Sequence, residues 1–346
     1  MNVLIRADAS VDIGSGHVMR CLALADGLRK AGARVAFASR PAPGDLCDFI
    51  AAKGYPVHRL SVGEDRGSDM DWETDAKQTI AVVRGDVPFD WLIVDHYALD
   101  RRWESTMRPC AKAVMVIDDL ANRIHDCDIL LDQNYYKGLD TRYDDLTPKT
   151  CKKLLGPQFA LLRPEFSAAR PCEPRDTPVV RRILVFLSSA DPSNVTSRVL
   201  EALDAVASPG VEVDIVVGAA SLHVAALTAY CSRRPGRRLH VQTSRMAELL
   251  AATDVAIGGG GATSWERACL GVPSLVIGLA DNQIAIAEAL ASAGTQLYLG
   301  RVEDMDDSSL RAALAVLLEN RHLRAALART AFTLTDGGGV GRVICH

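Results

Sequence analysis

The sequence of 346 residues predicts an α/β protein built from two doubly wound, Rossmann-like domains facing across a cleft. Short apolar runs typical of buried strands alternate with helical segments in both halves of the chain. Between the halves lies a tract, residues 171–178, whose three prolines in eight residues fit neither a helix nor a central strand. The length also corresponds to about two domains of ordinary size.

Composition narrows the class of protein. The chain is 48% hydrophobic and 24% charged, which is enough for a sizeable core. A net charge of −4 and a pI near 6.1 argue against nucleic acid as a partner. Nine cysteines without a Cys-x-x-Cys pair indicate reduced thiols. No apolar run reaches the roughly 18 residues of a membrane span, and the chain enters its first strand at once, so we expect a cytoplasmic protein without a signal peptide.

A histidine at a helix start is the first candidate for chemistry. The chain runs from a strand at residues 3–8 through a loop containing Gly14 and Gly16 to His17, which begins a helix at about residues 18–31. Because the positive end of a helix dipole disfavours imidazolium, His17 should stay neutral and able to accept a proton. It is therefore a candidate general base. The alternative is a histidine that caps its own helix.

The rest of the first half continues the strand–helix alternation. The expected strands are residues 34–40, 57–60, 91–97, 113–117 and 128–131, and the expected helices are residues 46–53 and 72–84, with a loop at 61–71 and an extended segment at 156–166. Ligands collect at the carboxyl ends of parallel strands, so Asp95, His96 and Tyr97 should face the same crevice as His17. Alternatively, Tyr97 packs at a sheet edge. Acidic residues end later strands too, but their spacing matches no metal-ligand set.

The second half repeats the alternation. We expect strands at residues 183–187, 211–217, 239–242, 255–257, 274–277 and 296–299, and helices at 196–206, 222–231, 246–252, 262–270, 282–293 and, for the most part, 308–334. The predicted domains are therefore residues 1–170 and 179–335, joined by the linker 171–178 and followed by a loose, glycine-rich tail, residues 336–346.

The most informative stretch of the second half is a strand, four glycines at residues 258–261 and a helix start with Thr263 or Ser264 as N-cap. Glycines let the backbone take positive φ angles and approach a ligand, and free amides at a helix start bind anions. Glu266 lies early in this helix, and Asn282 and Gln283 follow the next strand. An ordinary turn that binds nothing is the alternative, but the combination favours a nucleotide-sugar site.

Several short motifs between residue 3 and about residue 299 are specific in combination. They are Arg6-Ala-Asp8, Ile13-Gly-Ser-Gly-His17-Val-Met-Arg20, Val94-Asp-His-Tyr97-Ala-Leu-Asp100, Val116-Ile-Asp-Asp-Leu-Ala121, Cys127-Asp-Ile-Leu-Leu-Asp-Gln-Asn134 and Leu161-Leu-Arg163-Pro-Glu-Phe166. This combination resembles the UDP-2,4-diacetamido-2,4,6-trideoxy-β-L-altropyranose hydrolase family (PseG) of pseudaminic-acid biosynthesis. The region of Glu266 and Asp281-Asn-Gln283 also resembles the related MurG-type UDP-N-acetylglucosamine transferases.

The resemblance implies a GT-B fold and an inverting hydrolase that needs neither metal nor cofactor. Such an enzyme releases UDP from its UDP-sugar by water attack at the anomeric carbon, with His17 as the base or water-positioning group and Tyr97 as a supporting polar group. The implied substrate contacts are Gly16, Arg20, Arg163, Asn282 and Gln283. The expected UDP contacts are Gly259, Gly260, Gly261, Ala262, Thr263, Ser264 and Glu266, with the phosphates at the backbone amides and the ribose at Glu266.

One departure from the family pattern bears on function. Where the family has Gly-Gly at the end of the first strand of the second domain, this chain has Ser188-Ser189, whose side chains could narrow the site. Two alternatives therefore stay open: a GT-B glycosyltransferase that uses a UDP-amino-sugar donor, and a non-catalytic nucleotide-sugar binding module.

Overall fold

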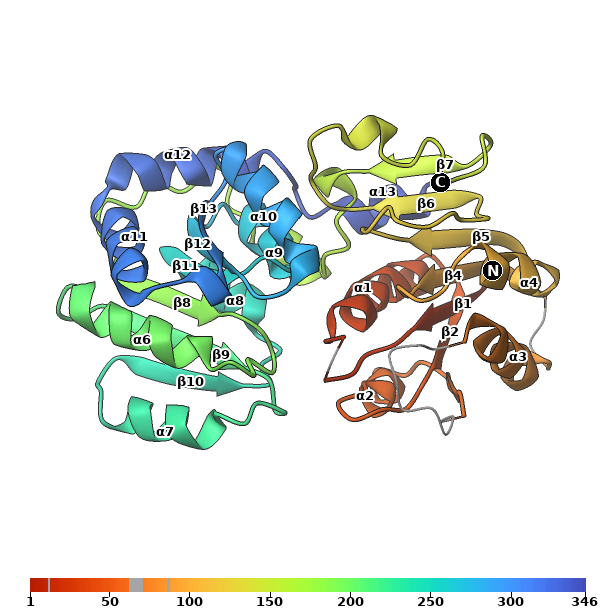
Figure 1. The fold of residues 1–346 in the computed structure, drawn as a ribbon, viewed down its shortest axis with the longest axis horizontal. Helices are drawn as coiled ribbons and strands as arrows, with labels where there is room; N and C mark the ends of the chain where they lie inside the picture. Colours follow the sequence, from red (N-terminus) through yellow and green to blue (C-terminus); the bar gives the residue numbers. More distant parts are fainter. Residues whose placement is uncertain (12, 62–70, 86–87) are drawn as a thin grey trace. The chain divides into compact units, whose positions relative to one another are not determined.

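The computed structural model describes residues 1–11, 13–61, 71–85 and 88–346 (Figure 1). Most of the loop expected at residues 61–71 lies outside this part of the chain. Contacts divide the chain into two compact units. The first unit comprises Met1–Asn134, Gly138–Leu161 and Gly339–His346, and the second comprises Tyr135–Lys137 and Leu162–Gly338.

The first unit contains a seven-stranded parallel sheet with the strand order β3-β2-β1-β4-β5-β6-β7 (Figure 1). Its strands are β1 Asn2–Ala7, β2 Arg34–Ser39, β3 Val57–Arg59, β4 Phe89–Asp95, β5 Ala111–Ile117, β6 Ile129–Asp132 and β7 Lys152–Leu155. Its helices are α1 Gly16–Lys30, α2 Cys47–Ala52, α3 Trp72–Val83, α4 Arg101–Met107 and α13 Gly339–Ile344, with 3-10 turns at Arg108–Cys110, Leu139–Thr141 and Pro157–Phe159.

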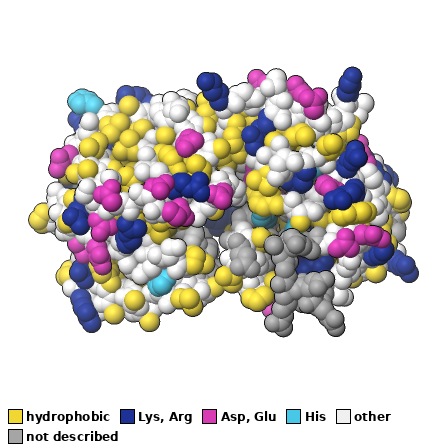
Figure 2. Space-filling view, viewed as in Figure 1, with side chains coloured by type: hydrophobic (Ala, Val, Ile, Leu, Met, Phe, Trp, Pro, Cys, Tyr) yellow, Lys and Arg dark blue, Asp and Glu magenta, His cyan; other side chains and the backbone are white. Residues whose placement is uncertain are grey.

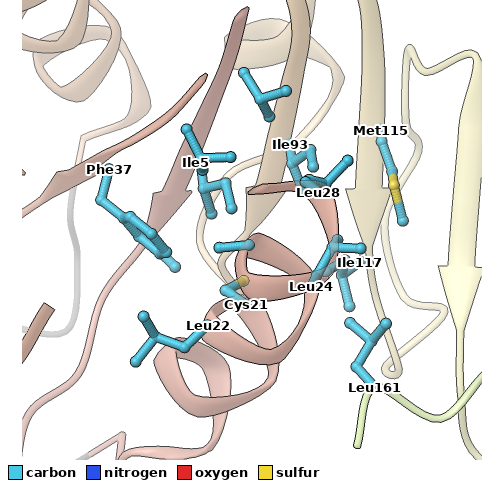
Figure 3. Packing of buried hydrophobic residues seen from close by; sticks show 14 of the residues in the cluster. Ile5, Cys21, Leu22, Leu24, Leu28, Phe37, Ile93, Met115, Ile117 and Leu161 are labelled. Carbon is cyan, nitrogen blue, oxygen red and sulfur yellow. The ribbon is translucent and has the colours of Figure 1, made fainter. Parts of the chain in front are cut away.

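Alternate residues of the strands pack on opposite faces of this sheet. Ile5 belongs to the cluster that contains residues of α1, α2 and α13, whereas its neighbour Leu4 belongs to the cluster of α3 and α4. Both faces are thus covered, which explains why the strands read as continuous apolar runs. Figure 3 shows the first cluster, in which Leu24 and Leu28 of α1 meet side chains of the sheet.

The second unit contains a six-stranded parallel sheet with the order β10-β9-β8-β11-β12-β13. Its strands are β8 Arg182–Phe186, β9 Glu212–Val217, β10 Arg237–Val241, β11 Val255–Gly259, β12 Ser274–Gly278 and β13 Leu297–Arg301. Its helices are α5 Pro164–Ala169, α6 Val195–Val206, α7 Val224–Ser232, α8 Met246–Ala251, α9 Thr263–Cys269, α10 Asp281–Ser292, α11 Asp307–Glu319 and α12 Arg321–Phe332, with a 3-10 turn at Val302–Asp304. No helix in the described part of the chain is long and apolar enough to cross a membrane.

Several elements differ from expectation. Residues 164–166, the end of the segment expected to be extended, belong instead to α5, which begins at Pro164, a residue favoured in the first helical turn. The long helix expected at 308–334 is interrupted at Asn320, whose side chain accepts a hydrogen bond from the Leu323 amide (3.0 Å) and so caps α12. Strand β7 was not predicted, because only two of its four residues are apolar. Helix α4 was not predicted either.

The change between units lies at residue 161, earlier than the expected boundary at residue 170. Hydrogen bonds explain the difference. Arg170 donates to the carbonyl oxygens of Phe332 (2.8 Å) and Thr335 (2.8 Å), so α5 is fastened to the second unit. Arg175, inside the proline-rich tract, donates to the carbonyl oxygens of Thr253 (2.7 Å) and Ala251 (2.7 Å). The tract is therefore held along the surface of the second unit.

The glycine-rich end of the chain is not loose. Residues 339–344 form α13, which packs against α1 of the first unit (Figure 1). Gly339 is required there because a Cβ atom at this position would overlap the backbone of Phe159 and Ala160. Composition alone suggested irregular chain, but here glycine permits close packing.

This packing can be tested with two glycines of the same helix. Gly339→Ala is expected to destabilise the protein by about 1–3 kcal/mol, because the added methyl group overlaps fixed backbone. Gly341→Ala is the matched control, since open space surrounds its Cβ position; it should be neutral or stabilise α13 by up to ~1 kcal/mol. The measurement is the midpoint of urea unfolding, and equal midpoints for the two variants would contradict the packing of α13.

Candidate functional site

Strand β1 and helix α1 place His17 at the carboxyl edge of the first sheet. Gly14 has a φ of +74°, a backbone conformation that favours glycine. At Gly16, a Cβ atom would have no neighbouring atom within 4 Å, so close packing does not require a glycine there. The N-cap of α1 is Ser15, and no side chain caps this helix. The alternative in which His17 caps its own helix is therefore wrong. Only 7% of His17 is exposed.

The imidazole of His17 is held by Asp95, the last residue of β4. The distance between His17 Nδ1 and Asp95 Oδ1 is 2.5 Å, and Asp95 is fully buried. The pairing of β1 with β4 brings the two ends together, since Ala7 lies opposite Asp95. Burial by itself raises the pKa of Asp95, but Arg20 and His17 outweigh it and hold this pKa well below its ordinary value. Asp95 is thus a carboxylate, and the shared hydrogen belongs to His17 Nδ1.

A hydrogen on Nδ1 leaves Nε2 of the neutral ring with a lone pair. No hydrogen bond between described residues uses Nε2. Tyr97 touches the same ring: the two ring centroids lie 4.5 Å apart at an interplanar angle of 83°. The sequence therefore placed Tyr97 correctly beside His17, although the contact that the structure records is between rings.

Arg20, one turn along α1 from His17, is largely occupied by carboxylates. It donates to Asp95 from Nε (2.6 Å) and Nη2 (2.7 Å), and from Nη1 to Asp119 (3.0 Å). Burial lowers the pKa of Arg20, but the carboxylate of Asp95 raises it by more. The pKa therefore lies well above its ordinary value, and Arg20 is a permanent cation. Arg20 thus holds the Asp95 carboxylate in place, a role that the sequence did not predict.

A second buried network lies at the same edge. Arg6, within β1, forms two-pronged ion pairs with Asp8 and with Asp75 of α3. His96 accepts a hydrogen bond at Nδ1 from the Ala98 amide (3.1 Å), so its hydrogen lies on Nε2, 3.4 Å from Asp8. Burial lowers the pKa of His96. Sequence reasoning missed this network; the signal was a charged residue, Arg6, inside an apolar run.

The four glycines at the end of β11, residues 258–261, were expected to take positive φ angles and approach a ligand, but the structure gives another reason for them. None of Gly258–Gly261 has a positive φ, and two of them belong to the strand itself. A Cβ at Gly258 would lie 2.5 Å from Arg267 Nη1, and one at Gly259 would lie 2.6 Å from the Leu187 carbonyl oxygen. These positions are glycine because neighbouring groups approach closely.

The amides of this loop are partly used within the protein. Gln283 accepts hydrogen bonds at Oε1 from the amides of Gly260 (3.1 Å) and Leu279 (3.4 Å), so its amide side chain holds the loop in place. Asn282 lies beside it in the first turn of α10 and is exposed. The N-cap of α9 is Ala262 rather than Thr263 or Ser264. Hydrogen bonds between described residues leave the backbone N–H groups of Gly261 and Ala262 unused.

Glu266 and Arg163 both lie in the second unit and approach one another. Arg163 Nη2 is 3.8 Å from Glu266 Oε1, while Nη1 pairs with Glu165 (2.9 Å). The Glu266 side chain is 16% exposed, and its Oε2 has no hydrogen-bond partner among the described residues. Burial raises the pKa of Glu266 to about 7, despite the opposing charges of Arg163 and Arg267. Glu266 thus combines a buried oxygen that lacks a partner within the described part of the chain with a side chain that is only partly exposed.

The serine pair that departs from the family pattern shapes the loop after β8. Ser188 Oγ accepts a hydrogen bond from the Asp191 amide (2.8 Å). The Asp191 carboxylate in turn accepts from the amides of Val195 (3.0 Å) and Thr196 (2.9 Å) and thus caps α6. Asp191 has a φ of +45°, a strained value for a residue with a side chain. The Ser188 hydroxyl is thus engaged with the loop itself.

The charged side chains on the face shown in Figure 2 are of both signs and interspersed.

Comparison with curated proteins shows two informative relatives. Over 353 residues the chain is 28% identical to the spore coat polysaccharide biosynthesis protein SpsG of Bacillus subtilis (strain 168), covering 99% of this chain and 96% of the relative. Over 167 residues it is 35% identical to the UDP-2,4-diacetamido-2,4,6-trideoxy-beta-L-altropyranose hydrolase of Campylobacter jejuni subsp. jejuni serotype O:2, covering 48% of this chain and 53% of the relative. No protein-family model matches the chain.

Solved structures show the fold. MurG of Acinetobacter baumannii superimposes with a TM-score of 0.68 at 19% identity, covering 99% of this chain and 98% of that chain. The spinosyn rhamnosyltransferase SpnG complexed with spinosyn aglycone superimposes with a TM-score of 0.63 at 17% identity, covering all of both chains. The predicted fold class is confirmed: the two parallel sheets form a GT-B fold. The chain is distantly related to SpsG and to the hydrolase.

Proposed function

We propose that the protein is an inverting UDP-sugar hydrolase that acts on UDP-2,4-diacetamido-2,4,6-trideoxy-β-L-altrose, or a close relative of that sugar, without a metal or cofactor. The observation that carries this proposal is the buried His17–Asp95 pair, which leaves Nε2 as a free base at the carboxyl edge of a parallel sheet. The sequence relation to a protein described as this hydrolase supports the choice of reaction and substrate.

The proposed reaction is a displacement at the anomeric carbon. His17 Nε2 takes a proton from water, whose oxygen forms the new bond to the anomeric carbon. The bond from that carbon to the phosphate oxygen breaks, and its electron pair leaves with UDP. Asp95 holds the ring in the required tautomer and stabilises the imidazolium that forms. Tyr97, against the ring edge, limits its rotation.

UDP is proposed to bind the second unit. The unused amides of Gly261 and Ala262 would donate to the phosphates and stabilise the charge that develops on the leaving group. Glu266, whose side chain is 16% exposed, would accept hydrogen bonds from the ribose hydroxyls. Arg163 beside it would supply a positive charge to the substrate. The half-buried Gln283 keeps this loop in shape, and Asn282 is the exposed neighbour that would contact the substrate.

The role of His17 is tested by His17→Asn. Turnover of the UDP-sugar should fall by about 100- to 10,000-fold, because a positioned base is lost. KM should change far less, because the substrate is bound mainly by other groups. His322→Asn is the matched control: it makes the same substitution at an exposed position of α12 and should leave kcat unchanged. Steady-state release of UDP measures both parameters. Near wild-type kcat in His17→Asn would remove His17 from the mechanism.

The role of Glu266 is tested by uridine binding between pH 6 and 8. With a pKa of about 7, Glu266 is about one-tenth ionised at pH 6 and about nine-tenths at pH 8. The carboxylate accepts hydrogen bonds from the ribose hydroxyls more strongly than the protonated acid does, so uridine should bind more tightly as the pH rises. Glu266→Gln should remove this dependence, and Glu248→Gln, an exposed control, should keep it. Uridine is chosen because it lacks the phosphate that titrates near pH ~6.

Calorimetric titration gives the affinities. If uridine affinity still depended on pH in Glu266→Gln, the dependence would come from another group, and the proposed contact between Glu266 and the ribose would be wrong.

A further inference from the structure

Arg267 of α9 is a buried cation that forms no ion pair in the described part of the chain, although the charge of the neighbouring Glu266 carboxyl acts on its pKa. It is 4% exposed, and its guanidinium donates to three neutral oxygens: Thr263 Oγ1 (3.1 Å), Ser264 Oγ (3.1 Å) and the Gly259 carbonyl (3.0 Å). Its Nε has no hydrogen-bond partner among the described residues. Burial lowers the pKa of Arg267 to about 10, so the group remains charged at neutral pH. A buried charge with only neutral partners is costly.

The surrounding backbone makes room for this charge. Gly258 lacks the Cβ that would lie 2.5 Å from Arg267 Nη1, so the strand passes directly over the guanidinium. All three of its acceptors belong to the segment Gly259–Ser264, which also carries the unused amides of Gly261 and Ala262. The positive charge therefore lies beneath the loop on which the nucleotide phosphates are proposed to bind.

The contact with Thr263 also fixes the direction of a hydroxyl group. Because Thr263 Oγ1 accepts a hydrogen bond from Arg267, its own hydrogen points elsewhere, and it donates to no other described residue. Thr263 is half-buried, so this hydrogen can reach a ligand, whereas Ser264 is 5% exposed. A hydroxyl that accepts from a cation is a stronger donor to an anion.

We propose that Arg267 is a positioning residue for the diphosphate of a nucleoside diphosphate: it orients and polarises the Thr263 hydroxyl and places a fixed positive charge under the loop Gly259–Ser264. This inference rests on the proposed function, since it takes UDP as the ligand of that loop. It concerns the phosphates alone and predicts no role for Arg267 in holding the nucleoside.

The test compares UDP with uridine, which differ in the diphosphate only. In Arg267→Met, UDP affinity should fall by about 10- to 100-fold, as expected when an ionic hydrogen-bonding group is lost, while uridine affinity should stay within about twofold of wild type. Thr263→Val keeps the shape of the side chain and should weaken UDP selectively by about 3- to 10-fold. Ser274→Ala is the control, because Ser274 is a buried hydroxyl of the same unit that donates to Val272 and forms no hydrogen bond with Arg267 among the described residues.

Each outcome of the calorimetric titrations decides the proposal. A selective loss of UDP binding in Arg267→Met and Thr263→Val, absent in Ser274→Ala, supports it. Parallel losses of UDP and uridine, or an unchanged ratio of the two affinities, would show a merely structural Arg267 and overturn it. If Arg267→Met fails to fold, Thr263→Val alone tests the proposal: a selective loss of UDP binding supports it, and an unchanged ratio of the UDP and uridine affinities overturns it. Wild-type protein that binds neither ligand would overturn the proposed function, and this inference with it.

Discussion

The chemistry assigned to the first unit depends on one buried carboxylate, Asp95. A charge without solvent is stable only when its oxygens are matched by donors, and here His17 and Arg20 supply them. Both donors come from one face of α1, because residues three apart lie side by side on a helix, and the sheet brings β4 next to β1. One interaction thus sets the histidine tautomer, anchors the start of α1 and keeps Arg20 away from solvent.

The proposed phosphate site of the second unit differs, since the buried charged group beside it is a cation, Arg267. Arg267 has neutral acceptors only, and Gly258 leaves the space that the guanidinium occupies. An anionic ligand above the loop would provide the missing counter-charge. The raised pKa of Glu266, to about 7, reflects the same burial, so both ends of a nucleoside diphosphate would meet groups whose charge is poorly compensated inside the protein. Such groups are typical of binding sites.

Apolar runs and the alternation of elements predicted the fold class, since buried parallel strands leave a strong signal. They could not predict β7, where two lysines occupy an edge strand. For the site, the rule that ligands gather at strand ends brought His17, Asp95 and Tyr97 together correctly. It could not show that Arg20 is hydrogen-bonded to Asp95, or that Gln283 accepts a hydrogen bond from the Gly260 amide, because both contacts join residues far apart in the sequence. Gly258 and Gly339 are needed for close packing, a reason that composition does not reveal.

In the proposed reaction, water attacks the anomeric carbon of a UDP-sugar. The most direct measurement is to supply UDP-2,4-diacetamido-2,4,6-trideoxy-β-L-altrose without any acceptor in water enriched in heavy oxygen, and to locate the label by mass spectrometry. UDP should then be released unlabelled, and the label should enter the free sugar. Label in a phosphate product would mean attack at phosphorus, and the absence of UDP release would mean that the protein is no hydrolase of this substrate. Either result would contradict the proposed reaction.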